Sequence, residues 1–98
     1  MKLTEALETL KSAEISLRAK GVQHAGIFGS TARGDARTDS DVDVLIDFDP
    51  DAPITIYDYV SVKNDIEDLF GVKVDVVDSE GLKPNLRNSV VRDLVYAF

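Results

Sequence analysis

Two aspartates, Asp41 and Asp43, alternate with valines in a segment whose β-branched residues predict a strand. Residues i and i+2 of a strand point to one face and lie roughly 6.6 Å apart, so both carboxylates can converge on one point. Bare carboxylates about 4 Å apart repel by about 4 kcal/mol at an effective dielectric of about 20. A cation removes that penalty, and carboxylate oxygens suit Mg²⁺ or Mn²⁺. The spacing therefore predicts a metal site on this strand.

A third carboxylate, Asp75, interrupts a later segment that is otherwise almost wholly apolar. An unpaired charge is costly in such surroundings unless it binds a cation or reaches solvent. If the two strands are neighbours, about 4.8 Å apart, Asp75 joins the same cluster. The simpler interpretation is a charge on an edge strand.

Gly29 and Ser30 follow a short apolar segment, and ten residues separate Ser30 from Asp41. A glycine at a strand end lets the backbone approach a ligand closely, and a serine hydroxyl can bind phosphate. Together with the aspartates, the pair predicts a site for metal and phosphate.

Two other phosphate or metal motifs are excluded. Gly29 to Gly34 has the glycine spacing of a P-loop, but Asp35 and Ala36 stand where Lys and Ser or Thr are required. The aspartates from Asp39 resemble the start of an EF-hand loop, but Val44 and Pro50 replace its glycine and its final glutamate.

The surrounding pattern predicts the elements that position these residues. Apolar residues at helical spacing predict a helix over 3–20, and short β-branched runs predict strands over 22–28, 41–48 and 72–77, the last inside the sheet. Between the first two strands, 29–39 is expected to be a loop with one helical turn. Thr55 and Asp58 resemble a capping box before a helix that ends at Gly71. Pro84 begins a closing helix that extends toward Phe98. The expected order is α-β-β-α-β-α, in one domain over 1–98.

Composition excludes several classes of protein. The 98 residues contain no Cys and one His, so thiolate zinc sites, cysteine nucleophiles and histidine cages are not expected. The formal net charge is −7, and seven aspartates against one arginine between Asp35 and Asp51 account for −6 of it. This charge disfavours general nucleic-acid binding. The absence of a long apolar run argues against a membrane span and for a cytoplasmic protein.

The combined spacing resembles a known superfamily. Gly29-Ser30, then Asp41-Val42-Asp43, then a distant strand aspartate, is similar to the signature of the DNA polymerase β type nucleotidyltransferases. The segments 29–37 and 40–43 resemble the minimal MntA-like antitoxin branch, and the likeness extends over essentially the whole chain. The resemblance implies an α/β domain with a mixed sheet of three to four strands packed with helices.

The resemblance also implies roles for individual residues. Asp41 and Asp43 would bridge two Mg²⁺ ions, and Asp75 would bind the second ion and help to take the acceptor's proton. Gly29 and Ser30 would hold the β- and γ-phosphates of ATP. Arg33 is a candidate for steadying the phosphates or the acceptor, and neutralising nearby aspartates explains it equally well.

The implied function is transfer of AMP from ATP to a tyrosine of a partner HEPN-type ribonuclease toxin, in a toxin–antitoxin pair. One alternative is a binding module that neutralises the toxin by occlusion, with a vestigial nucleotide site. Another is a nucleotidyltransferase for a small molecule such as an aminoglycoside, although the chain has no room for a second domain to enclose it. A homo-oligomer, or a hetero-oligomer with the toxin, is compatible with either antitoxin role.

Overall fold

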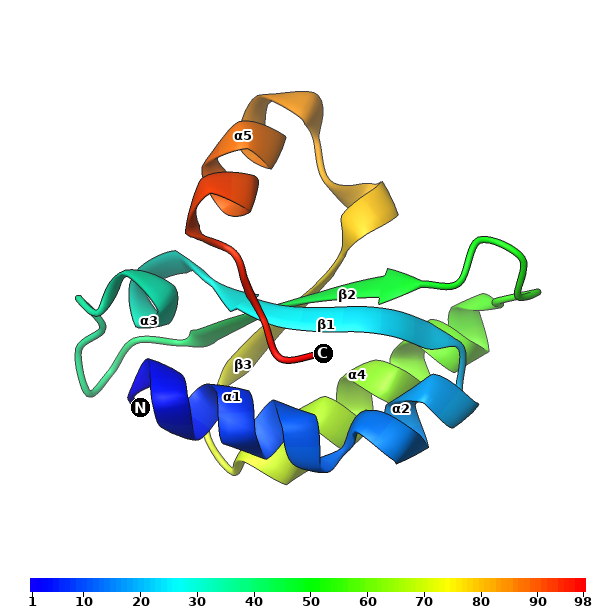
Figure 1. The fold of residues 1–98 in the computed structure, drawn as a ribbon, viewed down its shortest axis with the longest axis horizontal. Coiled ribbons are helices and arrows are strands. Elements are labelled where there is room, and N and C mark those ends of the chain that lie inside the picture. The colour runs from blue at the N-terminus through cyan, green and yellow to red at the C-terminus, as the bar shows by residue number, and fades with distance from the viewer.

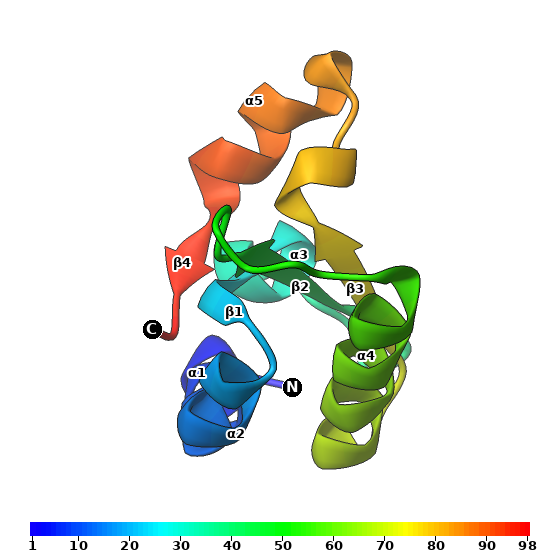
Figure 2. The same ribbon diagram turned by 90° about the vertical axis from the view of Figure 1, so that its right-hand side faces the viewer.

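A four-stranded mixed sheet separates two groups of helices in the computed structural model, which describes residues 1–98 (Figures 1 and 2). The strands lie in the order β3-β2-β1-β4; β2 and β3 are parallel, and β1 is antiparallel to both β2 and β4. Their bounds are β1 Val22–Phe28, β2 Val42–Phe48, β3 Val74–Asp78 and β4 Val95–Tyr96. The expected mixed sheet is confirmed, with four strands.

Three helices cover one face of the sheet and enclose the core (Figure 2). They are α1 (Leu3–Ser12), α2 (Glu14–Ala19) and α4 (Ile56–Phe70). Alternation along β2 buries Val42, Val44 and Ile46 against them. The single N-terminal helix expected from the sequence is divided at Ala13, whose N–H bonds the Leu10 carbonyl in a tighter turn.

The other face of the sheet carries α5 (Pro84–Asp93) and, near one end, α3 (Gly29–Arg33) (Figure 1). A short 3-10 turn, η1 (Ser79–Gly81), leads from β3 toward α5. Leu45, on this face of β2, is also buried. The residues on either side of it at strand spacing are Asp43 and Asp47, so the aspartates of β2 share the face that carries α5.

The predicted helix boundaries of α4 are confirmed. Thr55 and Asp58 form a reciprocal capping box, in which each side chain accepts a hydrogen bond from the other residue's backbone N–H. Gly71 ends the helix in the left-handed region, with φ of +66°. Pro84 occupies the first turn of α5, where its missing N–H has no cost. None of the helices combines the length and apolar character that crossing a membrane requires.

Two expectations about the sheet are wrong. The sequence predicts β3 inside the sheet, but β3 is an edge strand, and its apolar residues Val74 and Val76 are buried by the helical layer on one face. The closing helix ends at Asp93, and the apolar segment after it forms β4 and pairs with β1. Ala97 continues this pairing, since its N–H donates to the Ala25 carbonyl oxygen at 2.8 Å.

Candidate active site

Gly29 and Asp43 are packed against each other at one end of the sheet. Phe28, the last residue of β1, is the register partner of Asp43 on β2, so the chain turns into α3 directly beside this carboxylate. Gly29 has φ of +71°, and a Cβ at this position would overlap the Asp43 carboxylate. Only glycine meets both constraints without strain. The group that approaches Gly29 in the structure is the Asp43 side chain, and the approach of a ligand to this backbone stays a prediction.

Asp75 is the register partner of Asp43 on the neighbouring parallel strand. Side chains paired in this way project from the same face, about 4.8 Å apart at the backbone. Asp41 lies two residues before Asp43, just outside β2. The register therefore places Asp43 beside Asp75, with Asp41 two residues away along the chain.

The surroundings of Asp43 disfavour its ionised form. Burial raises the pKa of Asp43, and the charges of Asp75 and Asp41 raise it further, against a smaller opposing effect of Arg33. No three acidic or histidine side chains converge closely enough to form a ready metal cage. Strand pairing places Asp43 beside Asp75, and Asp41 lies two residues before Asp43; these three residues are the aspartate cluster.

Asp75 and Asp41 are more open than Asp43. Asp75 is exposed at the sheet edge, and the Asp41 carboxylate is partly covered. Lys73 Nζ lies 3.7 Å from Asp41 Oδ2, but the lysine side chain is 83% exposed, so this ion pair is weak. A substrate can approach the cluster from this side.

The first turn of α3 contains Ser30 directly after Gly29. The residue at its N-cap, Phe28, supplies no side-chain hydrogen bond, and the first turn contains no acidic residue. Ser30 is partly buried, and its carbonyl oxygen accepts from the Asp35 N–H at 3.1 Å, which folds the loop back on α3. Ser30 therefore follows directly on the glycine that packs against Asp43.

Arg33, at the end of α3, is held by two carboxylates. Its Nη1 donates to Asp93 Oδ2 at 2.8 Å, and its Nε donates to Asp35 Oδ2 at 3.2 Å. Both hydrogen bonds raise the pKa of Arg33, and the bond to Asp93 has the larger effect. Asp93 is the residue that sequence reasoning missed. It lies 60 positions from Arg33 in a different helix, and no local motif indicates the pair.

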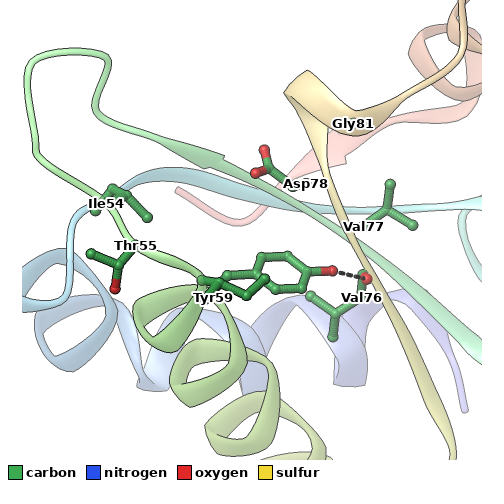
Figure 3. Close-up of a pocket in the computed structure, with 8 residues that line it drawn as sticks. Ile54, Thr55, Tyr59, Val76, Val77, Asp78 and Gly81 are labelled. Carbon is green, nitrogen blue, oxygen red and sulfur yellow. Dashed lines mark hydrogen bonds between the residues drawn. The ribbon is translucent and has the colours of Figure 1, made fainter.

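A cavity with a mainly apolar lining lies elsewhere (Figure 3). It has a volume of about 540 Å³ and lies between the N-terminus of α4 and the C-terminal end of β3, away from Asp41 and Asp43. The Tyr59 hydroxyl points toward β3 and donates to the Val76 carbonyl oxygen at 3.1 Å. This cavity contains no group of the aspartate cluster.

The donor set at the cluster fits a hard divalent cation. Carboxylate oxygens are the ligands that Mg²⁺ prefers, and mutual repulsion among Asp41, Asp43 and Asp75 is the cost that a cation would remove. Gly29 brings the start of α3 against the Asp43 carboxylate, so the backbone of that turn lies beside the cluster. The arrangement can therefore hold a metal–nucleotide complex.

Comparisons with known proteins agree with this chemistry. The sequence profile of the family described as nucleotidyltransferase domain matches residues 5–97. The protein adenylyltransferase MntA of Thermococcus cleftensis is 37% identical over 92 residues, which are 94% of this chain and 90% of the relative. A solved structure described as a minimal nucleotidyltransferase is 42% identical to this chain and has a TM-score of 0.76. The match covers 97% of this chain and 95% of the solved one.

A more distant structure shares the fold. It belongs to the complex of the tri-AMPylated Shewanella oneidensis HEPN toxin with an MNT antitoxin. The matched chain is 17% identical, with a TM-score of 0.64, and the match covers 94% of this chain and 71% of the solved one. The family profile and the Thermococcus relative each span nearly the full chain. The chain is therefore a nucleotidyltransferase and belongs to the nucleotidyltransferase domain family, in its minimal MntA-like branch.

Proposed function

We propose that this enzyme transfers AMP from ATP to a tyrosine hydroxyl of a partner HEPN-type toxin and thereby acts as its antitoxin. The observation that carries the proposal is the packing of Asp43 against Gly29, with Asp75 paired beside it. That arrangement places the backbone at the start of α3 beside a carboxylate cluster, and AMP transfer requires both a phosphate-binding and a metal-binding group. The MntA relative and the AMPylated toxin complex support the choice of AMP and of a protein acceptor.

Each residue has a separate task in this proposal. Gly29 and Ser30 bind the β- and γ-phosphates through backbone N–H groups and the hydroxyl, and Arg33 adds a positive charge beside them. Asp41 and Asp43 would hold two Mg²⁺ ions, and Asp75 one of them. When bound, Mg²⁺ would neutralise phosphate charge and lower the pKa of the acceptor hydroxyl.

The transfer itself exchanges a phosphoanhydride bond of ATP for a phosphodiester bond to the acceptor. The acceptor hydroxyl oxygen forms a bond to the α-phosphorus of ATP, the bond to the bridging oxygen of the β-phosphate breaks, and pyrophosphate leaves. The hydroxyl proton passes to the carboxylate of Asp75, which is exposed at the sheet edge and therefore open to an acceptor.

The test is incubation of the purified chain with α-labelled ATP, Mg²⁺ and the partner toxin. We expect label on a toxin tyrosine, and we expect the double variant Asp41→Asn/Asp43→Asn to reduce transfer at least a hundredfold. Asp51→Asn/Asp68→Asn is the matched control, because it removes the same charge from two exposed positions outside the cluster. Label transfer that survives in Asp41→Asn/Asp43→Asn would exclude these residue roles.

A cell-based measurement separates catalysis from occlusion. If AMP transfer neutralises the toxin, cells that express the toxin with Asp41→Asn/Asp43→Asn stop growing, whereas the control variant protects them. Protection by the catalytic double variant would instead favour neutralisation by binding. Transfer to an aminoglycoside but not to the toxin would identify a small-molecule enzyme.

A further inference from the structure

Asp93 is a nearly buried carboxylate that nothing in the proposed chemistry uses directly. It is the last residue of α5, and its side chain is only 8% exposed. Its strongest partner is Arg33 Nη1 at 2.8 Å, and the neighbouring Arg92 Nε lies 3.6 Å from its other oxygen. Arg92 is 74% exposed and contributes little. The charge of Asp93 is therefore compensated chiefly by Arg33.

Arg33 connects this carboxylate to the aspartate cluster. The arginine lies in the same short helix as Gly29, which packs against the Asp43 carboxylate. Two of its nitrogens, Nε and Nη1, donate to Asp35 and Asp93. Nη2 donates to no protein group, so it remains available for an anionic ligand.

The two carboxylates restrict a side chain that would otherwise be mobile. Arg33 is 45% exposed, and an arginine of this kind loses rotamer entropy when a ligand fixes it. Asp35 is 62% exposed and forms the longer bond, so it contributes less to the restriction than Asp93. A guanidinium fixed before the nucleotide arrives loses less entropy on binding.

We propose that Asp93 is a positioning residue, which holds the Arg33 guanidinium in the orientation that receives the triphosphate. The inference rests on the phosphate-binding role proposed for Arg33. It assigns to α5 a function at the nucleotide site, although α5 supplies no ligand to the aspartate cluster. The opposite role would be sequestration, in which Asp93 competes with phosphate for Arg33. The two roles predict opposite changes in affinity for ATP.

Equilibrium binding of Mg²⁺–ATP, measured by calorimetry without any acceptor, distinguishes them. We expect Asp93→Asn to weaken ATP binding about five- to twentyfold and to raise KM for ATP in the transfer assay, with kcat at saturating ATP within twofold. Asp65→Asn is the matched control, because it breaks the ion pair of Asp65 with Lys20, far from α3. It should leave the affinity for ATP unchanged. Tighter binding by Asp93→Asn would establish sequestration and overturn the proposal.

A double-mutant cycle tests whether Asp93 acts through Arg33. In the Arg33→Ala background, Asp93→Asn should change ATP affinity less than twofold, because the group that it positions is absent. An equal loss in both backgrounds would show a merely structural role. If Asp93→Asn fails to fold, Arg33→Lys serves instead: lysine keeps the charge but cannot contact both carboxylates as a fork, so the proposal requires weaker ATP binding. Absence of AMP transfer to the toxin, with these affinity changes intact, would refute the proposed acceptor alone.

Discussion

Gly29 is subject to two constraints that can be separated experimentally. Its positive φ and its contact with Asp43 each exclude a side chain. We expect Gly29→Ala to cost about 1–2 kcal/mol through left-handed strain and to lower AMP transfer about a hundredfold, because the Asp43 carboxylate must move. Thermal unfolding and the transfer assay measure the two effects.

The control for this substitution is Gly34→Ala. Gly34 has φ of +83°, but no atom lies within 4 Å of the position that its Cβ would occupy. The Gly34→Ala variant should therefore lose a similar amount of stability and keep most of the transfer activity. Equal loss of activity in both variants would mean that strain in the loop, rather than displacement of Asp43, limits catalysis.

The raised pKa of Asp43 leads to a prediction about stability in the presence of a chelator. The folded protein binds the proton of the Asp43 carboxyl group more tightly than the unfolded chain does. Protonation of Asp43 therefore stabilises the fold fully below the ordinary aspartate pKa of 3.8, and this stabilisation is lost as pH rises through the raised pKa of the folded state. Asp43→Asn should therefore raise the unfolding temperature at pH 7 and have little effect below about pH 4. A loss of stability at pH 7 would show instead that the charged carboxylate is favourably bound.

At the scale of the elements, local chemistry predicts α4 well. Its first turn depends on hydrogen bonds between residues three apart, Thr55 and Asp58, and its end depends on the backbone freedom of Gly71. Such signals are contained within a few residues, so the sequence alone displays them. The strand β2 was equally predictable, because its alternating aspartates and β-branched residues have a period of two.

The position of each strand in the sheet was not predictable in the same way. A continuous apolar run is typical of an inner strand, yet β3 lies at the edge, where α4 and its neighbours bury only one face. For β4, the pattern Leu94 to Phe98 is compatible with a helix or a strand, and pairing with β1, 70 residues earlier, decides it. A separation of 60 residues likewise concealed the contact between Arg33 and Asp93, whereas Gly29, Ser30, Asp41 and Asp43 were close enough to form a motif.

The capping box gives a prediction that separates an element from the active site. Thr55→Ala removes the side-chain oxygen that accepts from the Asp58 N–H, and we expect a loss of about 1 kcal/mol in the free energy of unfolding. AMP transfer at 25 °C should stay within twofold, because the box lies beside the cavity in Figure 3 and not beside Asp43. Denaturant unfolding measures the first effect. A large loss of AMP transfer by Thr55→Ala, under conditions where the variant is fully folded, would show that the start of α4 contributes to the active site.

At the scale of the whole molecule, the charge of −7 has two parts with different consequences. Most of the acidic side chains lie on the surface, where salt screens them without regard to the identity of the cation. Asp41, Asp43 and Asp75 form a local cluster, whose repulsion a single divalent ion can relieve. The stability of the protein should therefore respond to Mg²⁺ beyond its response to ionic strength.

The unfolding temperature of the nucleotide-free protein measures this difference. Mg²⁺ at about a hundred times its dissociation constant should stabilise the folded state by about 2.7 kcal/mol, which for a chain of this size is a rise of roughly 10 to 20 °C. NaCl at equal ionic strength should give only a small rise. Asp41→Asn/Asp43→Asn should lose the Mg²⁺ response and keep the NaCl response, while Asp51→Asn/Asp68→Asn keeps both. An equal Mg²⁺ response in the two double variants would mean that diffuse acidity, and not the cluster, binds the ion.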